Sequence, residues 1–327
     1  MPSTDNRSSD YPIRRIAISG ASGFLGSALA ARLQREGLTI QRLRRGERAA
    51  SPDIAWHPDV GKLDVAALDG VDAVVNLSGE QIARRWTAKR KRAIHESRVS
   101  ATTLLARSIA ELDHPPKVFV SGSAIGIYGN RESEELDEDS TLGSDFLAEV
   151  AIDWERSTEA ARAAGVRVVL IRTGIVLNPR GGALKKMLLP FKLGVGGRIG
   201  SGEQWMSWIA LEDWVAAVEF VLAEDLAGPV NVVAPNPVPN ADFAKTLARV
   251  LRRPAVAPVP AIAIALVFGE MGRTTLLSSQ RVHPRRLDER GFQFAHSTLE
   301  QALRAELGSR ALAPGPLESS PSTRSAR

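Results

Sequence analysis

The sequence of 327 residues contains no cysteine, so it forms no disulfide bond and offers no thiolate to a metal. This absence suits a reducing compartment, and we expect a cytoplasmic protein. No stretch approaches the roughly 20 apolar residues that cross a bilayer, and the polar start of the chain lacks the apolar core of a signal peptide. We therefore expect no membrane partner.

The net charge and the spacing of the histidines argue against nucleic-acid binding and metal binding. The formal net charge of +5 is modest for this length and does not by itself indicate nucleic acid. The densest basic run, residues 84–92, begins a helical pattern whose apolar stripe is Ile94, Ala101, Leu105 and Ile109, so a solvated helix face is the better interpretation. No metal-ligand spacing links the five histidines, which are His57, His95, His114, His283 and His296. We expect no metal and no nucleic acid partner.

A glycine-rich turn is the strongest positive feature. An apolar strand from Ile16 leads into Gly20-Ala-Ser-Gly23-Phe-Leu-Gly26, and a helical pattern follows. The first glycine permits a tight turn, the second lets the backbone approach a pyrophosphate, and the third lets the helix pack closely on the sheet. The helix start then directs N–H groups at the phosphates. The sequence predicts a dinucleotide site formed by Gly20, Ser22, Gly23, Phe24, Leu25 and Gly26.

Strands and helices alternate along the body of the chain, which predicts a parallel, doubly wound sheet. The expected strands span 16–19, 39–43, 73–77, 117–121, 167–172 and 230–233, and the expected helices span 27–36, 89–111 and 146–164. Glycine and proline crowd the sequence from 179 onward. We predict an α/β protein with a Rossmann-type domain (13–178, with 207–234 returning to it), a small C-terminal α+β substrate lobe and lid (179–206 and 235–308), and disordered ends (1–12 and 309–327).

The most apolar run in the chain extends from Pro258 to Phe268. It is too short to cross a membrane, and we interpret it as a buried helix.

The end of the second strand indicates which dinucleotide fits. A site for NAD usually places an acidic residue there for the ribose 2′-hydroxyl, whereas this strand ends Arg42-Leu43-Arg44-Arg45 with no acid. Guanidinium groups bind phosphate oxygens with paired donors, so Arg44 and Arg45 favour the 2′-phosphate of NADP(H). The alternative is a solvated basic edge.

Several further motifs resemble the extended branch of the short-chain dehydrogenase/reductase superfamily, and within it the epimerase-like branch with a C-terminal extension domain. They include Asn76-Leu77-Ser78-Gly79, Ser121-Gly-Ser123-Ala-Ile-Gly-Ile-Tyr128, Asp153-Trp154-Glu155, Arg172-Thr-Gly-Ile-Val-Leu177 and the segment Gly200 to Trp208. The likeness covers residues 14–307. It implies a Rossmann-type fold, a nicotinamide cofactor and a sugar-like or nucleotide-linked substrate.

The resemblance also implies roles for individual residues. Asn76, Leu77, Ser78, Gly79 and Ser121 would line the cofactor, and Ser123 would lie beside the nicotinamide. Substrate would meet Arg172, Gln204, Ser207 and Trp208. Arg172 can hold an anion with paired donors, and Trp205 and Trp208 either stack on a ring or pack in the core. The helix over 89–111 is a dimer surface in resembling proteins, so a homodimer is an expectation of the resemblance alone.

One departure bears on activity. Working members of the superfamily use a tyrosine four residues before a lysine, which lowers the tyrosine pKa for proton exchange. Here the only tyrosines are Tyr11 and Tyr128, neither is followed by such a lysine, and the helix at 146–151 has neither phenol nor amine. Two hypotheses remain. The protein is either an oxidoreductase or epimerase using Ser123, Tyr128 or Glu149, or an inactive NADP(H)-binding or sensing protein. For Tyr128 the alternative is a pocket wall, and for Glu149 it is a helix-face carboxylate or a partner of Arg172.

Overall fold

An eight-stranded sheet organises the molecule. The structure, a computed structural model, describes residues 13–254 and 257–308, so the expected disordered ends lie outside the described residues. The strand order is β12 (Gly228–Val232), β8 (Arg167–Thr173), β6 (Val118–Ala124), β5 (Ala73–Asn76), β1 (Arg15–Ser19), β2 (Thr39–Arg45), β3 (Ile54–His57) and β4 (Lys62–Leu63). Every neighbouring pair is parallel except β3 and β4. The predicted doubly wound fold is confirmed.

The strand order reverses between β1 and β5. From β1 the chain moves outward to β2 and β3, and from β5 it moves the other way to β6, β8 and β12. Ligands of such sheets bind outside the carboxyl ends of the strands at this switch point.

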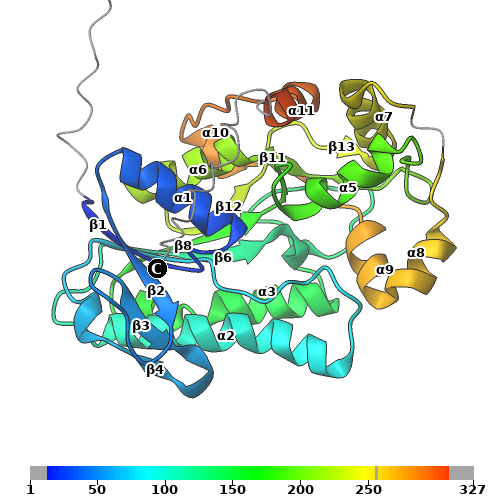
Figure 1. The fold of residues 1–327 in the computed structure, drawn as a ribbon. Coiled ribbons are helices and arrows are strands. Elements are labelled where there is room, and N and C mark those ends of the chain that lie inside the picture. Colours follow the sequence, from blue (N-terminus) through cyan, green and yellow to red (C-terminus); the bar gives the residue numbers. More distant parts are fainter. Residues whose placement is uncertain (1–12, 255–256, 309–327) are drawn as a thin grey trace, which may run out of the picture.

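Helices cover both faces of the sheet (Figure 1). Strand residues alternate between the faces, so Ile16 and Ile18 pack in one core with α1 (Phe24–Arg35) and α6 (Leu211–Ala223). Ala17 and Phe119 pack in the other core with α2 (Ala88–Ala110) and α4 (Glu159–Ala163). As predicted, Leu105 and Ile109 of α2 face the sheet, but Ile94 does not, because it packs with Trp86, Val150 and Met271.

Two helix predictions needed correction. The helix expected from 146 to 164 is divided into α3 (Phe146–Arg156) and α4, because Ser157 and Thr158 bond back to the backbone of α3. Helix α1 begins at Phe24, not at Ser27, so the glycine turn is tighter than predicted. Strands β3 and β4 were not predicted.

The C-terminal lobe has its own core, which includes Leu184, Phe191, Trp208, Phe243 and Leu303. Three small sheets pair β9 (Ile175–Leu177) with β11 (Trp208–Ala210), β10 (Trp205–Met206) with β13 (Val238–Pro239), and β7 (Glu135–Leu136) with β14 (Arg281–Val282). The remaining α-helices are α5 (Gly182–Lys192), α7 (Asn240–Leu251), α8 (Ala261–Phe268), α9 (Glu270–Leu276), α10 (Arg285–Glu289) and α11 (Leu299–Gly308).

The interpretation of the most apolar run as a buried helix is wrong. The run does form helix α8, but only Ile264 is buried, while Ile262 and Leu266 are 74% and 72% exposed. Helix α9 packs on one side of α8, where Ile264 meets Gly272.

Candidate cofactor and substrate site

The glycine turn lies at the switch point between β1 and β5. Gly20 has a φ of +70°, and a Cβ at this position would lie 2.6 Å from the carbonyl oxygen of Leu77. At Gly26 a Cβ would lie 2.3 Å from the carbonyl oxygen of Gly20. Side chains are therefore excluded at both positions, and the backbone of the turn is packed between α1 and the end of β5.

The start of α1 offers backbone donors. Within the described chain no side chain caps this helix, and its first turn contains no acidic residue. Ser22 at the turn is exposed, and Phe24 and Leu25 are half-buried. Uncapped N–H groups and the positive end of the helix dipole form a site for an anion.

Asn76 and Ser78 use their side chains to join β1 and β5. The Asn76 amide accepts a hydrogen bond from Ser19 Oγ at 2.5 Å and donates one to Thr102 Oγ1 at 2.7 Å. Ser78 Oγ donates to Ser19 Oγ at 2.9 Å. Both residues and Ser121 are buried, so they fix the strand ends. The backbone of Leu77 and Gly79 then lies just past the carboxyl end of β5.

Arg98 contributes a cation next to Gly79 and Glu80. Its guanidinium donates to the carbonyl of Glu80 at 3.1 Å and stacks on the Trp154 ring at 5.1 Å. Burial lowers the pKa of Arg98 to about 10, so it stays charged at neutral pH.

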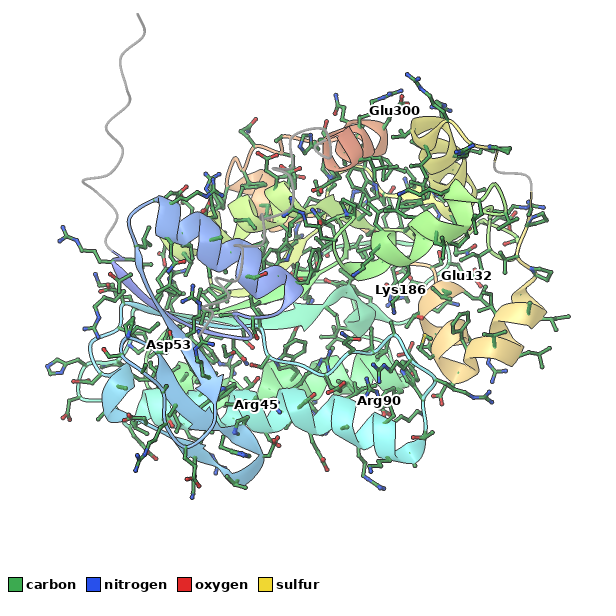
Figure 2. All side chains as sticks on the ribbon, viewed as in Figure 1. Arg45, Asp53, Arg90, Glu132, Lys186 and Glu300 are labelled. Atoms are coloured by element: carbon green, nitrogen blue, oxygen red, sulfur yellow. The ribbon has the colours of Figure 1, made fainter. Side chains whose placement is uncertain are left out.

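The end of β2 carries two arginines and one acid. The Arg44 guanidinium pairs with the Asp53 carboxylate, which also accepts a hydrogen bond from the Arg42 backbone at 3.1 Å. Burial acts to raise the pKa of Asp53, but these bonds outweigh it and lower the pKa. Arg45 lies 3.5 Å from the exposed Asp59, and Figure 2 shows Arg45 and Asp53 at this end of the sheet. The loop before β3 thus places an acidic side chain at the end of the strand.

Ser123, at the carboxyl end of β6, is hydrogen-bonded to a carboxylate. Its hydroxyl donates to Glu155 Oε1 at 2.6 Å. Arg172 holds the same carboxylate with two donors, Nε to Oε1 at 2.8 Å and Nη2 to Oε2 at 2.9 Å. Burial alone would lower the pKa of Arg172, but Glu155 and the Tyr128 hydroxyl raise it. Arg172 and Ser123 therefore fix the position of the Glu155 carboxylate.

Tyr128 is fully buried behind Arg172. Its hydroxyl donates to Asn231 Oδ1 at 2.7 Å and accepts from Arg172 Nη1 at 3.0 Å. Burial raises the pKa of Tyr128 to about 12. The phenol is thus protonated at neutral pH, which is opposite to the lowered pKa that a proton-exchanging tyrosine needs.

Glu149 does not join this cluster. It is exposed in the first turn of α3, which Asp145 caps through bonds to Leu147 N and Ala148 N. Glu149 is thus a helix-face carboxylate, the first of its two structural alternatives, and the second is corrected because the partner of Arg172 is Glu155. The inward face of α3 consists of Ala148, Val150, Ala151 and Trp154, and Trp154 packs against Gly122 in β6.

Three of the residues predicted to meet substrate donate hydrogen bonds to the chain's own backbone. Gln204 Nε2 donates to the carbonyls of Ile199 and Leu276 at 3.1 Å each. Ser207 Oγ donates to the Gln280 carbonyl at 2.8 Å. Trp208 is fully buried, and its indole donates to the Asn236 carbonyl at 3.0 Å, so the core-packing alternative holds for Trp208.

The lobe also touches the glycine turn. The Phe24 ring lies directly against Gly181, where a Cβ would come within 2.4 Å of it, and Gly181 precedes α5. Farther along α5, Lys186 Nζ donates to the Ala83 carbonyl at 3.2 Å, and Figure 2 labels this lysine near α9. The lobe therefore contacts the segments that follow both β1 and β5.

Two negative findings apply to the described residues. No cluster of three or more histidine, aspartate or glutamate side chains in residues 13–254 and 257–308 is arranged to hold a metal ion. No helix in the same ranges is long and apolar enough to cross a membrane.

Known protein families and relatives match this chain along almost its whole length. Residues 16–234 match the NAD dependent epimerase/dehydratase family, and residues 259–306 match a domain of unknown function, DUF1731. The chain is 43% identical over 290 residues to an epimerase family protein of Mycobacterium bovis, covering 88% of this chain and 96% of that protein. It is 38% identical over 294 residues to the epimerase family protein YfhF of Bacillus subtilis, covering 88% and 96%.

A solved structure is similar over the same range. The crystal structure of human epimerase family protein SDR39U1 with NADPH superposes with a TM-score of 0.82 at 34% identity, covering 90% of this chain and 99% of that one. A UDP-glucuronic acid 4-epimerase from Bacillus cereus, with a TM-score of 0.72 and 16% identity, shares the fold. From its sequence match and its sheet, this chain belongs to the NAD dependent epimerase/dehydratase family.

Proposed function

We propose that the protein is an NADP(H)-dependent oxidoreductase or epimerase-like enzyme that acts on a sugar-like or nucleotide-linked substrate. The observation that carries the proposal is the uncapped start of α1 behind a turn that excludes side chains, at the switch point of the sheet. Arg44 and Arg45 at the end of β2 favour binding of the 2′-phosphate that distinguishes NADP(H) from NAD(H). The human relative solved with NADPH supports the same cofactor.

The residues present fit such a cofactor. The turn from Gly20 to Gly26 would hold the pyrophosphate, and the Arg98 cation adds positive charge beside Gly79. Arg44 would exchange its Asp53 partner for the 2′-phosphate. A bound nicotinamide supplies or accepts a hydride.

Ser123 and Glu155 provide the proton path in this proposal. Because the Ser123 hydroxyl donates to Glu155, its free lone pairs can accept a hydrogen bond from a substrate hydroxyl. A proton that leaves the substrate oxygen for Ser123 Oγ is matched by transfer of the serine proton to Glu155 Oε1, 2.6 Å away. In this scheme Arg172 and Tyr128 hold Glu155 in place, and Glu149 has no part.

A second candidate function is binding or sensing of NADP(H) without chemistry. The apolar inward face of α3 favours it, because this helix carries no phenol or amine where working relatives place both. The high pKa of Tyr128, about 12, favours it too.

Cofactor binding is tested by titrating the stripped protein with NADPH and NADH and following nicotinamide fluorescence. We expect NADPH to bind at least tenfold more tightly. The variant Arg44→Asp/Arg45→Ser should weaken NADPH far more than NADH, whereas Arg107→Ser, at an exposed arginine near the end of α2, should change neither. Equal losses for both nucleotides would remove the 2′-phosphate assignment, and absence of binding would overturn the proposal.

Catalysis is tested with deuterium-labelled NADPH and a panel of carbonyl and sugar-nucleotide compounds. An enzyme transfers label to one of them, and Ser123→Ala should abolish the transfer while NADPH still binds. Binding without transfer to any compound supports the sensing function.

A further inference from the structure

Exposed apolar side chains gather on two segments of the C-terminal lobe. In the part of the chain that the structure describes, nine large apolar side chains are exposed, and seven of them lie in residues 189–195 or 262–268. These seven, called the apolar patch, are Leu189 (65% exposed), Leu193 (69%), Val195 (56%), Ile262 (74%), Leu266 (72%), Val267 (61%) and Phe268 (36%). Such a concentration marks an interaction surface.

The chain that follows the first segment pairs with the chain that precedes the second. Backbone hydrogen bonds join Val259 N to the Arg198 carbonyl at 2.8 Å and Gly200 N to the Val259 carbonyl at 2.9 Å. Helix α8 begins two residues later, at Ala261. Figure 1 shows α8 and α9 at the right-hand end of the molecule, away from strands β1 to β4.

Helix α8 has no polar side chain with which to recognise a partner. Its sequence is Ala-Ile-Ala-Ile-Ala-Leu-Val-Phe. A helix that is apolar on all sides is normally buried in a core or in lipid, yet α8 buries only Ile264. Eight residues extend about 12 Å, which is too short to cross a bilayer but suits insertion at its surface.

Lysines and arginines outnumber acidic residues around the patch, whose nearest acidic neighbours in the sequence are Glu203, Asp242 and Glu270. Residues 181–202 contain four lysines and arginines, residues 243–269 contain another four, and neither segment contains aspartate or glutamate. Lys192, Arg252 and Arg253 are exposed, and none of the three pairs with a carboxylate within the described ranges. The nearby Glu270 is neutralised by Lys91 at 2.5 Å.

The cations beside the apolar patch indicate which kind of partner it binds. A second copy docked through a two-fold axis would bring Lys192, Arg252 and Arg253 of both copies into one interface, which is unfavourable. Protein interfaces depend on tryptophan, tyrosine and arginine anchors, whereas this patch is aliphatic with one phenylalanine. Aliphatic side chains bordered by lysine and arginine are typical of helices that lie in the headgroup region of anionic membranes.

We propose that the apolar patch docks this protein on the surface of an anionic lipid membrane, with α8 inserted among the headgroups and the neighbouring cations on lipid phosphates. The expectation of no membrane partner rested on the lack of a spanning segment, and surface docking needs none. The proposal is independent of the cofactor assignment.

The test is sedimentation of the full chain with vesicles of phosphatidylcholine alone or with about a third phosphatidylserine. We expect at least tenfold stronger binding to the anionic vesicles, weakened by added salt. Ile262→Ser/Leu266→Ser should reduce binding at least tenfold. The matched control is Val60→Ser/Leu142→Ser, at the two exposed apolar residues outside the patch, and it should bind like the parent.

The charge requirement is tested with Arg252→Glu/Arg253→Glu, against Arg107→Glu/Arg290→Glu at exposed arginines elsewhere. Only the first pair should lose anionic binding. Thermal unfolding of each variant checks that it folds. Lack of parent binding to anionic vesicles, or equal losses in the control variants, overturns the proposal. So does a patch-dependent dimer in analytical ultracentrifugation without vesicle binding, which would identify a second copy as the occupant.

Discussion

The Ser123 hydroxyl donates its hydrogen bond to Glu155, the carboxylate that Arg172 holds from its other side. The serine is 5% exposed and the arginine 4% exposed, so the group is nearly sealed from water. In such surroundings each member of the Arg172–Glu155 pair compensates the loss of hydration of the other. The network therefore fixes the orientation of Ser123.

We expect Glu155→Gln to lower the free energy of unfolding by about 3 kcal/mol, because it leaves the Arg172 charge buried without a partner. Urea unfolding measures the change. Glu149→Gln, on the same helix but exposed, is the control and should cost under about 0.5 kcal/mol. Similar losses for the two variants would show that the Arg172 pair does not stabilise the fold.

Asp53→Asn should increase the preference for NADPH over NADH by about threefold to tenfold, which corresponds to roughly 1 kcal/mol. The Asp53 carboxylate competes with a 2′-phosphate for Arg44 and also repels it. Paired fluorescence titrations of the two nucleotides measure the ratio. Asp59→Asn, at the exposed partner of Arg45, is the control and should change the ratio less. An unchanged or reduced NADPH preference in Asp53→Asn would contradict the expected competition.

Local spacing made much of the fold predictable. The glycine turn and the central strands follow from glycine conformation and from runs of buried apolar residues, which depend on neighbours in sequence. The break between α3 and α4 depends on two hydroxyl groups that bond backward to the helix, and apolar periodicity does not report it.

The polar partners in the site were not predictable in this way. Asp53 reaches Arg44 because β2 and β3 pair in parallel with Arg44 opposite Ala55. Glu155 reaches Ser123 across 32 residues because α3 packs on β6. The spacing gave no reason to choose Glu155 over Glu149, since only the direction of each side chain on α3 separates them. The burial of α8 was not predictable from its composition, because an entirely apolar helix here buries only Ile264.

Gly26→Ala should destabilise the protein and abolish nucleotide binding, since the added Cβ would lie 2.3 Å from the Gly20 carbonyl oxygen and would force α1 away from the turn. We expect a cost of about 2 to 3 kcal/mol and at least a hundredfold weaker NADPH binding. Thermal unfolding and fluorescence titration measure the two effects. Gly308→Ala, where a Cβ meets nothing within 4 Å, is the control. Parent-like binding in Gly26→Ala would exclude close packing of this turn.

Glu219 on α6 makes the stability of the fold depend on pH. Its carboxylate lies 3.2 Å from Arg32 of α1, but burial and the neighbouring Glu36 raise its pKa from 4.5 to about 7. A carboxyl group whose pKa is higher in the folded protein than in the unfolded chain favours folding while it is protonated. This contribution is complete below pH 4.5 and is lost as the pH rises through about 7.

Comparison of the parent with Glu219→Gln isolates that contribution. Glutamine does not titrate, so the parent should lose on the order of 2 to 3 kcal/mol relative to the variant between pH 4.5 and 8. Urea unfolding at a series of pH values measures the difference. Glu212→Gln, at a carboxylate of the same helix that is 67% exposed, should parallel the parent curve. A difference between parent and Glu219→Gln that stays constant with pH would show that Glu219 titrates as it does in the unfolded chain, and the α1–α6 contact would then hold an ordinary ion pair.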